Sequence, residues 1–179
     1  MNERITFVST FDDVSSDKIL GYLNRLDDKL CKVPFGKNVL NREEADTLPY
    51  HFTLMYWEVE LEREVLEALS KIQLSKVKVV VDDIKIIKGS DDSYELFFNI
   101  EENEKLKLVQ QQLYDLLPSD IYKIGRRSFH ISIQADKDYD KVLKMKEILM
   151  ENFSPFELNV SFYRLYRIYP AELVFEIRK

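Results

Sequence analysis

The sequence predicts an α+β fold made of two similar βαβαβ halves. Runs of alternating apolar and polar residues, typical of strands, are interspersed with apolar stripes at helical spacing. The same order of elements occurs before residue 90 and again after it, and each half contains one of the two histidines in the pattern histidine, apolar, hydroxyl residue, apolar. We therefore expect each half to form an antiparallel-rich sheet with helices outside it, so that the two sheets face a central cleft.

The composition is that of one globular domain, residues 1–179, with pseudo-symmetric halves at 1–90 and 91–179. Its 32% charged residues and four glycines exclude a disordered or fibrous chain. The net charge of -6 argues against an extended nucleic-acid-binding surface, which would need many cations to neutralise phosphates. No apolar run approaches a membrane span and no signal-peptide pattern opens the chain, so we expect a cytoplasmic protein.

The first half begins with an alternating run over residues 5–11, which predicts a strand. Ser15 and Ser16 offer an N-cap for a helix whose apolar stripe runs from Ile19 to Leu30. Residues 31–49 are mixed and polar and predict a long loop, a kind of segment that is often functional. A histidine strand, a helix and a long valine-rich strand then follow at 51–57, 61–72 and 76–88.

The second half follows a turn signal at 89–92 and repeats this order. Its elements are a strand, a helix that Pro118 ends, the second histidine strand, a helix and a strand, at residues 94–100, 106–116, 127–134, 142–149 and 157–168. A last strand at 173–177 closes the chain.

The two histidine motifs are His51-Phe52-Thr53-Leu54 and His130-Ile131-Ser132-Ile133. Side chains two apart on a strand point to the same side, so His51 should share a face with Thr53, and His130 with Ser132. The apolar residues between them would be buried against helices. If the halves pack about a pseudo-dyad, both imidazoles and both hydroxyls meet in one cleft.

Such a quartet suits phosphodiester chemistry. Histidine titrates near neutrality, so one ring can act as a base while the other protonates the leaving oxygen. The hydroxyls of Thr53 and Ser132 can bind the non-bridging phosphate oxygens. Neither a metal nor another cofactor is required. A single strand histidine is more often structural than catalytic, and a metal site would need more than two histidine ligands.

The motifs resemble the paired His-x-Thr/Ser-x signatures of the two-histidine (2H) phosphoesterase superfamily, which includes the 2'-5' RNA ligase-like proteins and the cyclic nucleotide phosphodiesterases. Size, element order and motif spacing extend the resemblance over essentially the whole chain. It implies a bilobal α+β fold with a central cleft, and metal-independent attack on 2',3'-cyclic phosphates or 2'-5' linkages of a nucleotide or short RNA end. By analogy, His130 would activate water or a hydroxyl and His51 would protonate the leaving oxygen. The alternatives are a catalytically silent nucleotide- or RNA-binding module of the same fold and a metal-dependent hydrolase.

Other residues of the motif strands are candidates for substrate contacts. Trp57 is predicted to share the face of His51 and could stack on a base, although a core or surface tryptophan is the more common case. Ser128 and Gln134 are predicted to share the face of His130 and to add polar contacts.

Basic residues near the second motif could bind phosphate. Arg127 precedes the motif, and Tyr163 and Arg167 share one face of the strand expected near the cleft. The other face of that strand carries Arg164, Tyr166 and Ile168, so only one of the two sets can line the site. Many relatives carry a basic residue close behind a motif, where this chain has Met55 and Gln134, which leaves the substrate class open.

Overall fold

The computed structural model describes residues 4–26, 38–39, 47–89, 92–119, 128–168 and 171–179. Within them, seven strands form one sheet in which every pairing is antiparallel. The strands of this sheet are β1 (Arg4–Phe11), β4 (His51–Glu58), β5 (Val77–Lys88), β6 (Tyr94–Ile100), β7 (His130–Asp136), β8 (Phe156–Ile168) and β9 (Glu172–Arg178). Their order is β4-β1-β8-β5-β6-β7, with β9 paired to β8.

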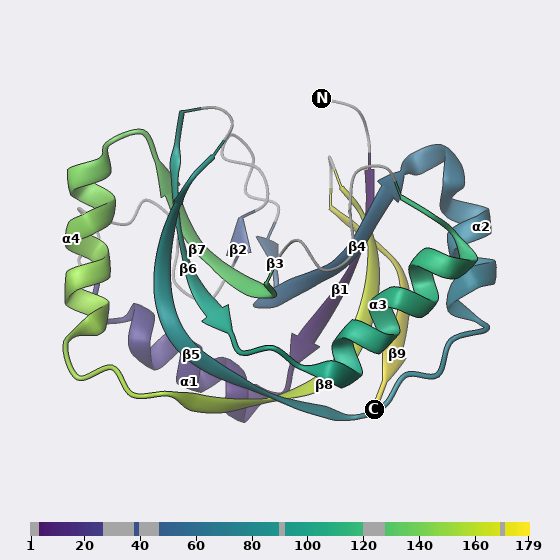
Figure 1. Cartoon of the computed structure of the whole chain (residues 1–179), viewed down its shortest axis with the longest axis horizontal. Helices are drawn as coiled ribbons and strands as arrows, with labels where there is room; N and C mark the ends of the chain where they lie inside the picture. Colours follow the sequence, from purple (N-terminus) through teal and green to yellow (C-terminus); the bar gives the residue numbers. More distant parts are fainter. Residues whose placement is uncertain (1–3, 27–37, 40–46, 90–91, 120–127, 169–170) are drawn as a thin grey trace.

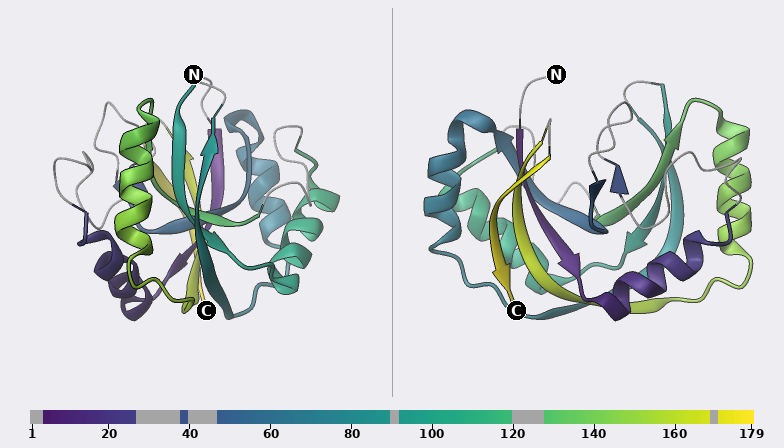
Figure 2. Two further views of the ribbon diagram at one scale, coloured as in Figure 1. Left: turned by 60° about the vertical axis from the view of Figure 1, so that its left-hand side comes forward. Right: turned by 180° about the vertical axis from the view of Figure 1, so that it is seen from behind.

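Helices cover one face of this sheet. They are α1 (Asp13–Leu23), α2 (Glu62–Leu69), α3 (Glu104–Leu116) and α4 (Tyr139–Met150), with a short 3₁₀ helix (Val59–Leu61) before α2. The sheet is strongly curved and the helices lie outside the curve, α4 beside β5, β6 and β7 and α3 beside β4 (Figures 1 and 2). We call this outer, convex face the helix face. No helix of the described ranges has both the length and the apolarity of a membrane span.

The predicted α+β class is confirmed, but the two expected sheets are one continuous sheet. The reason is the length of β5 and β8, which have 12 and 13 residues. Their N-terminal parts pair with each other, Val77–Val81 against Phe156–Val160, and their C-terminal parts pair with β6 and β1. These two strands therefore join what would otherwise be separate sheets.

The strand order is the one that two equivalent halves would give. It reads the same from either end if β1, β4 and β5 correspond to β6, β7 and β8. The long third strand of each half pairs with the first strand of the other half, β8 with β1 and β5 with β6. The duplication itself stays a prediction from the sequence.

The boundaries of several elements differ from the sequence prediction. The N-cap of α1 is Asp12, whose carboxylate accepts a hydrogen bond from the backbone N–H of Ser15 at 2.8 Å. Ser15 is the third residue of the helix, and its hydroxyl instead accepts a hydrogen bond from the backbone N–H of Asn159 at 2.8 Å. Within the predicted loop 31–49, β2 (Asn38–Val39) pairs with β3 (Thr47–Leu48).

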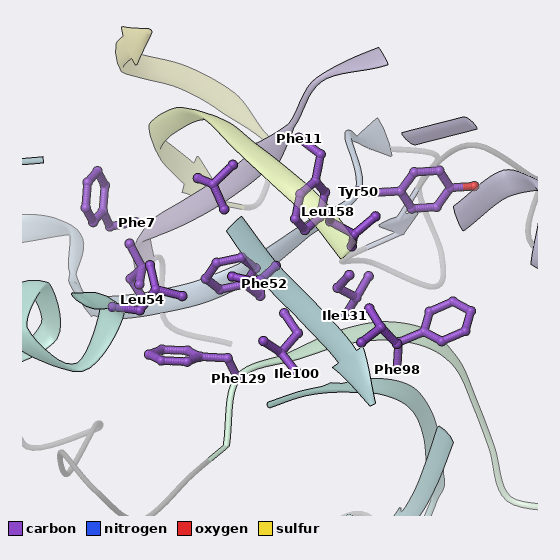
Figure 3. Close-up of a cluster of buried hydrophobic side chains, with 14 of the residues drawn as sticks. Phe7, Phe11, Tyr50, Phe52, Leu54, Phe98, Ile100, Phe129, Ile131 and Leu158 are labelled. Carbon is purple, nitrogen blue, oxygen red and sulfur yellow. The ribbon is translucent and has the colours of Figure 1, made fainter. Parts of the chain in front are cut away.

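The hydrophobic core lies between the sheet and the helices. Figure 3 shows part of it, with side chains from β1, β4, β6, β7 and β8 gathered in one cluster. Phe52 of the first motif and Phe129, which precedes the second, meet there with ring centroids 5.5 Å apart. Burial of these apolar neighbours fixes the orientation of both motif strands.

Candidate active site

The two histidines begin the two outermost strands of the sheet. His51 is the first residue of β4 and His130 is the first residue of β7. Because the sheet curves, these edge strands approach each other at their starts (Figure 1). The ring contact between Phe52 and Phe129 joins the strands on the helix face. The structure therefore brings together two imidazoles that are far apart in the sequence.

Both imidazoles are oriented by the same local hydrogen bond. Nδ1 of His51 lies 2.9 Å from the carbonyl oxygen of Pro49, and Nδ1 of His130 lies 3.2 Å from that of Ser128. A carbonyl oxygen can only accept, so Nδ1 carries the donated proton in each case. In a neutral ring this leaves the lone pair on Nε2, where it can take a proton from a substrate or water.

A β-bulge lies at the fourth position of the first motif. Thr53 pairs with Val8 and Met55 with Phe7, so Leu54 is an extra residue on β4. The buried side-chain amide of Gln110, on α3, donates a hydrogen bond to the carbonyl oxygen of Leu54 at 2.7 Å. The bulge is thus held by a helix from the other half of the chain.

The second motif has its bulge at the same position. Ser132 pairs with Phe97 and Gln134 with Leu96, so Ile133 is the extra residue on β7. Bulges interrupt the alternation of side chains and often occur beside functional sites. The two motifs share their residue types, their hydrogen bonds and this irregularity of the backbone.

The bulges overturn two predicted site residues. Trp57 lies opposite Ile5 on the helix face, is 1% exposed, and donates its indole N–H to the carbonyl oxygen of Leu117 at 3.0 Å. Gln134 lies opposite Leu96, a fully buried residue. Directly paired residues point to the same side of a sheet. Neither side chain therefore shares a face with the histidines.

The predicted set on β8 is also wrong. Tyr163 is fully buried and donates its hydroxyl to the carbonyl oxygen of Ser75 at 2.8 Å. Arg167 binds Glu62 on α2 at 2.8 Å. Arg167 pairs with Ile5, which lies on the helix face, and Tyr163 is four residues earlier on the same strand. Both side chains therefore point to the helix face.

The alternate residues of β8, Arg164, Tyr166 and Ile168, lie on the same face of the sheet as the histidines, which we call the histidine face. Arg164 lies opposite Val8, which is itself opposite Thr53. The Arg164 guanidinium stacks over the ring of Phe162 at 4.4 Å, with Arg178 of β9 over the same ring at 5.6 Å. Arg164 also pairs with Glu176 at 2.6 Å. A basic and aromatic surface therefore extends from the first motif.

His51 is held in its neutral form. The residue is only 6% exposed. Burial lowers the pKa of His51 from 6.5 to about 4; the hydrogen bond to the Pro49 carbonyl opposes this shift, and repulsion by His130 adds to it.

Glu95 is a site residue that the sequence analysis missed. It lies on β6, and its carboxylate oxygen Oε1 accepts the hydroxyl of Ser132 at 2.6 Å and lies 3.8 Å from Nε2 of His130. The ring of Phe97, also on β6, packs on His130 with the centroids 4.8 Å apart. The alternation of Glu95, Phe97 and Asn99 along the predicted strand was the signal available in the sequence.

Two further polar residues lie directly opposite the histidines. Thr10 of β1 pairs with His51, and Asn99 of β6 pairs with His130. Both are buried, and Thr10 Oγ1 and Asn99 Oδ1 have no hydrogen-bond partner among the described residues. They occupy equivalent places beside the two histidines.

Two predicted site residues remain, Ser128 and Arg127. Ser128 is exposed and contributes its backbone carbonyl to His130. Arg127 lies outside the described residues. Across the described ranges, no three histidine, cysteine, aspartate or glutamate side chains are grouped so as to hold a metal ion.

Leu48 of β3 packs on the histidine face. It forms a buried cluster with Val8, Tyr166 and Ile168. Leu48, which falls within the predicted loop 31–49, therefore covers part of β1 and β8 beside Thr53.

No protein-family model and no curated protein matches the sequence significantly. Solved structures match over nearly the whole length. The apo form of E. coli LigT matches with a TM-score of 0.65 and 11% identity, over 98% of this chain and 96% of that one. E. coli LigT complexed with 3'-AMP matches with a TM-score of 0.63 and 12% identity, over 99% and 98%. Kluyveromyces marxianus Usb1 with uridine monophosphate matches with a TM-score of 0.59 and 12% identity, over 99% and 98%. The protein therefore has the fold of LigT and Usb1, which is the fold of the 2H phosphoesterases that its two histidine motifs resemble.

Proposed function

We propose that the protein is a metal-independent phosphodiesterase. It would hydrolyse 2',3'-cyclic phosphate or 2'-5' phosphodiester bonds of a nucleotide or short RNA end, or form such bonds in the reverse direction. The observation that carries this proposal is the matched presentation of His51 and His130, each on an edge strand with Nδ1 bonded to a carbonyl oxygen. The nucleotide complexes of E. coli LigT and of Usb1 support a nucleotide as the ligand of this fold.

The electrostatics favour His51 as the base, which reverses the roles expected from the family analogy. A ring with a pKa of about 4 is protonated in about one molecule in a thousand at neutral pH, which disfavours it as the acid there. His130 is more exposed and, when protonated, has the Glu95 carboxylate 3.8 Å from Nε2 as a counter-charge. We therefore assign the acid role to His130.

The proposed step is an in-line displacement at phosphorus. Nε2 of His51 takes a proton from water as its oxygen bonds to phosphorus. The bond from phosphorus to the 2' or 3' oxygen breaks, the electron pair stays on that oxygen, and His130 supplies its proton. The Thr53 hydroxyl would donate to a non-bridging oxygen, and Arg164 would bind a neighbouring phosphate of a longer substrate.

The test is a turnover assay with 2',3'-cyclic nucleotides, 2'-5' oligoadenylate and RNA ends that carry a cyclic phosphate, with and without chelator. We expect activity that survives chelator and falls at least about 100-fold in His51→Ala and in His130→Ala. Tyr163→Phe, on the other face of the sheet, is the control and should keep its turnover. Binding without turnover would instead support a silent binding module, and loss of activity with chelator would support a metal-dependent hydrolase.

A further inference from the structure

One carboxylate makes the two motifs chemically unequal. Oε1 of Glu95 accepts the Ser132 hydroxyl at 2.6 Å and lies 3.8 Å from Nε2 of His130. The side chains of Glu95 and His130 are 30% and 27% exposed, so the carboxylate reaches solvent on the histidine face. It lies beside the place where a phosphoryl group must bind if His130 is to protonate a leaving oxygen.

The first motif has no such group. Glu95 lies two residues before Phe97, which pairs with Ser132, and the corresponding residue of β1 is Thr6, two residues before the partner of Thr53. Thr6 is uncharged. Within the part of the chain that the structure describes, no carboxylate is hydrogen-bonded to Thr53. Among the described residues, a carboxylate is therefore bonded to the motif hydroxyl in the second motif and not in the first.

The bond to Glu95 changes what Ser132 can recognise. A hydroxyl has one proton, and Ser132 donates it to the carboxylate. Phosphate oxygens without a proton accept hydrogen bonds and do not donate them, so they gain nothing from this hydroxyl while Glu95 holds it. Thr53 is left as the hydroxyl that can donate to phosphate.

The carboxylate also distinguishes phosphates by charge. A phosphodiester carries one negative charge, whereas a monoester carries nearly two above its second pKa of about 6. One additional unit of charge about 5 Å from a carboxylate lowers affinity about fourfold in water, and further where water is excluded. The penalty falls on the monoester, which is the product of hydrolysing a cyclic phosphate.

We propose that Glu95 is a specificity-determining residue that selects monoanionic phosphodiesters and disfavours phosphomonoesters, so that the hydrolysed product leaves the site. This inference rests on the proposed function, because it assigns the phosphate to the two histidine motifs. His130, when protonated, balances the charge of Glu95 while the diester is bound. The proposed step transfers this proton to the leaving oxygen, so Glu95 faces the doubly charged product with its own charge uncompensated.

The test compares Glu95→Gln with Glu172→Gln, each introduced into a His51→Ala background that prevents turnover. Glutamine keeps the size of the side chain and an oxygen that can accept the Ser132 hydroxyl. Glu172 lies on β9 of the same sheet and pairs with Arg167 on the helix face, so its replacement removes one charge far from the site. Dissociation constants are measured near neutral pH for adenosine 2',3'-cyclic phosphate and for adenosine 2'-monophosphate.

We expect Glu95→Gln to tighten monophosphate binding more than cyclic phosphate binding, so that the preference for the diester falls about fourfold or more. Glu172→Gln should leave this preference unchanged. An unchanged preference in Glu95→Gln, or an equal change in both variants, overturns the proposal. A wild-type protein that binds both ligands but turns over neither would overturn the proposed hydrolysis without altering this binding comparison.

Discussion

The buried imidazole of His51 should make the protein less stable in mild acid by a calculable amount. The ring titrates at about 4 in the folded chain and at 6.5 in the unfolded chain. The unfolded state therefore binds more protons between these values, and stability falls as the pH falls through this window. It is fully present above about pH 6.5. From about pH 7.5 to about pH 5 the loss attributable to this ring is about 2 kcal/mol.

The assay is urea unfolding at these two pH values for the wild type, His51→Gln and His130→Gln. Glutamine does not titrate, so His51→Gln should lose about 2 kcal/mol less than the wild type between the two conditions. His130→Gln, whose replaced ring is more exposed, should follow the wild type more closely. If the wild type and His51→Gln lose equal stability, the ring is not held neutral by burial, and its assignment as the base loses its physical support.

Three further predictions concern turnover and the strand that carries the first motif. The acid limb of kcat/KM for hydrolysis should lie near pH 4, since activity is lost when the base is protonated; a limb near pH 6.5 would contradict a buried base. Gln110→Leu should lower the free energy of unfolding in urea by about 1–3 kcal/mol, because it leaves the Leu54 carbonyl unpaired. Gln111→Leu, at an exposed neighbour on α3, should lower it much less. Equal losses would exclude the proposed support of the bulge. Arg164→Gln should raise KM for an RNA substrate several-fold more than Arg167→Gln does, and the reverse order would place the substrate on the wrong face.

The sequence was sufficient to predict the elements because their apolar periodicity is clear. The strand predicted at residues 94–100 agrees with β6, and the histidine strand predicted at 51–57 ends one residue before β4 does. It was also sufficient to pair the histidines, because the motif recurs at matching places in two similar series of elements. These inferences depend on local pattern and element order.

The sequence was insufficient for residues beyond each bulge. Alternation was extended through the motif to Trp57 and Gln134, but the extra residue reverses the face from that point. The consecutive apolar residues Leu54 and Met55 were a sign of this in β4. No such sign exists in β7, where polar Gln134 follows Ile133. Only the pairing with the neighbouring strand reveals the second bulge.

The choice between the two faces of β8 was beyond the sequence for another reason. Both faces carry an arginine and a tyrosine, so composition does not distinguish them. The pairing of Arg164 with Val8, and of Val8 with Thr53, decides it. Glu95 was overlooked because its partner Ser132 is distant in the sequence and becomes adjacent only when β6 pairs with β7.

The pairing of the third strand of each half with the opposite half affects the order in which the sheet can form during synthesis. When the ribosome has made β1, α1, β4, α2 and β5, the last of these has no neighbour, because its partners β6 and β8 have not yet been translated. The open edge of β1 must wait until β8, near the C-terminus, leaves the exit tunnel. Closure of the sheet is therefore among the last events of synthesis and folding, and only then do the two imidazoles come together.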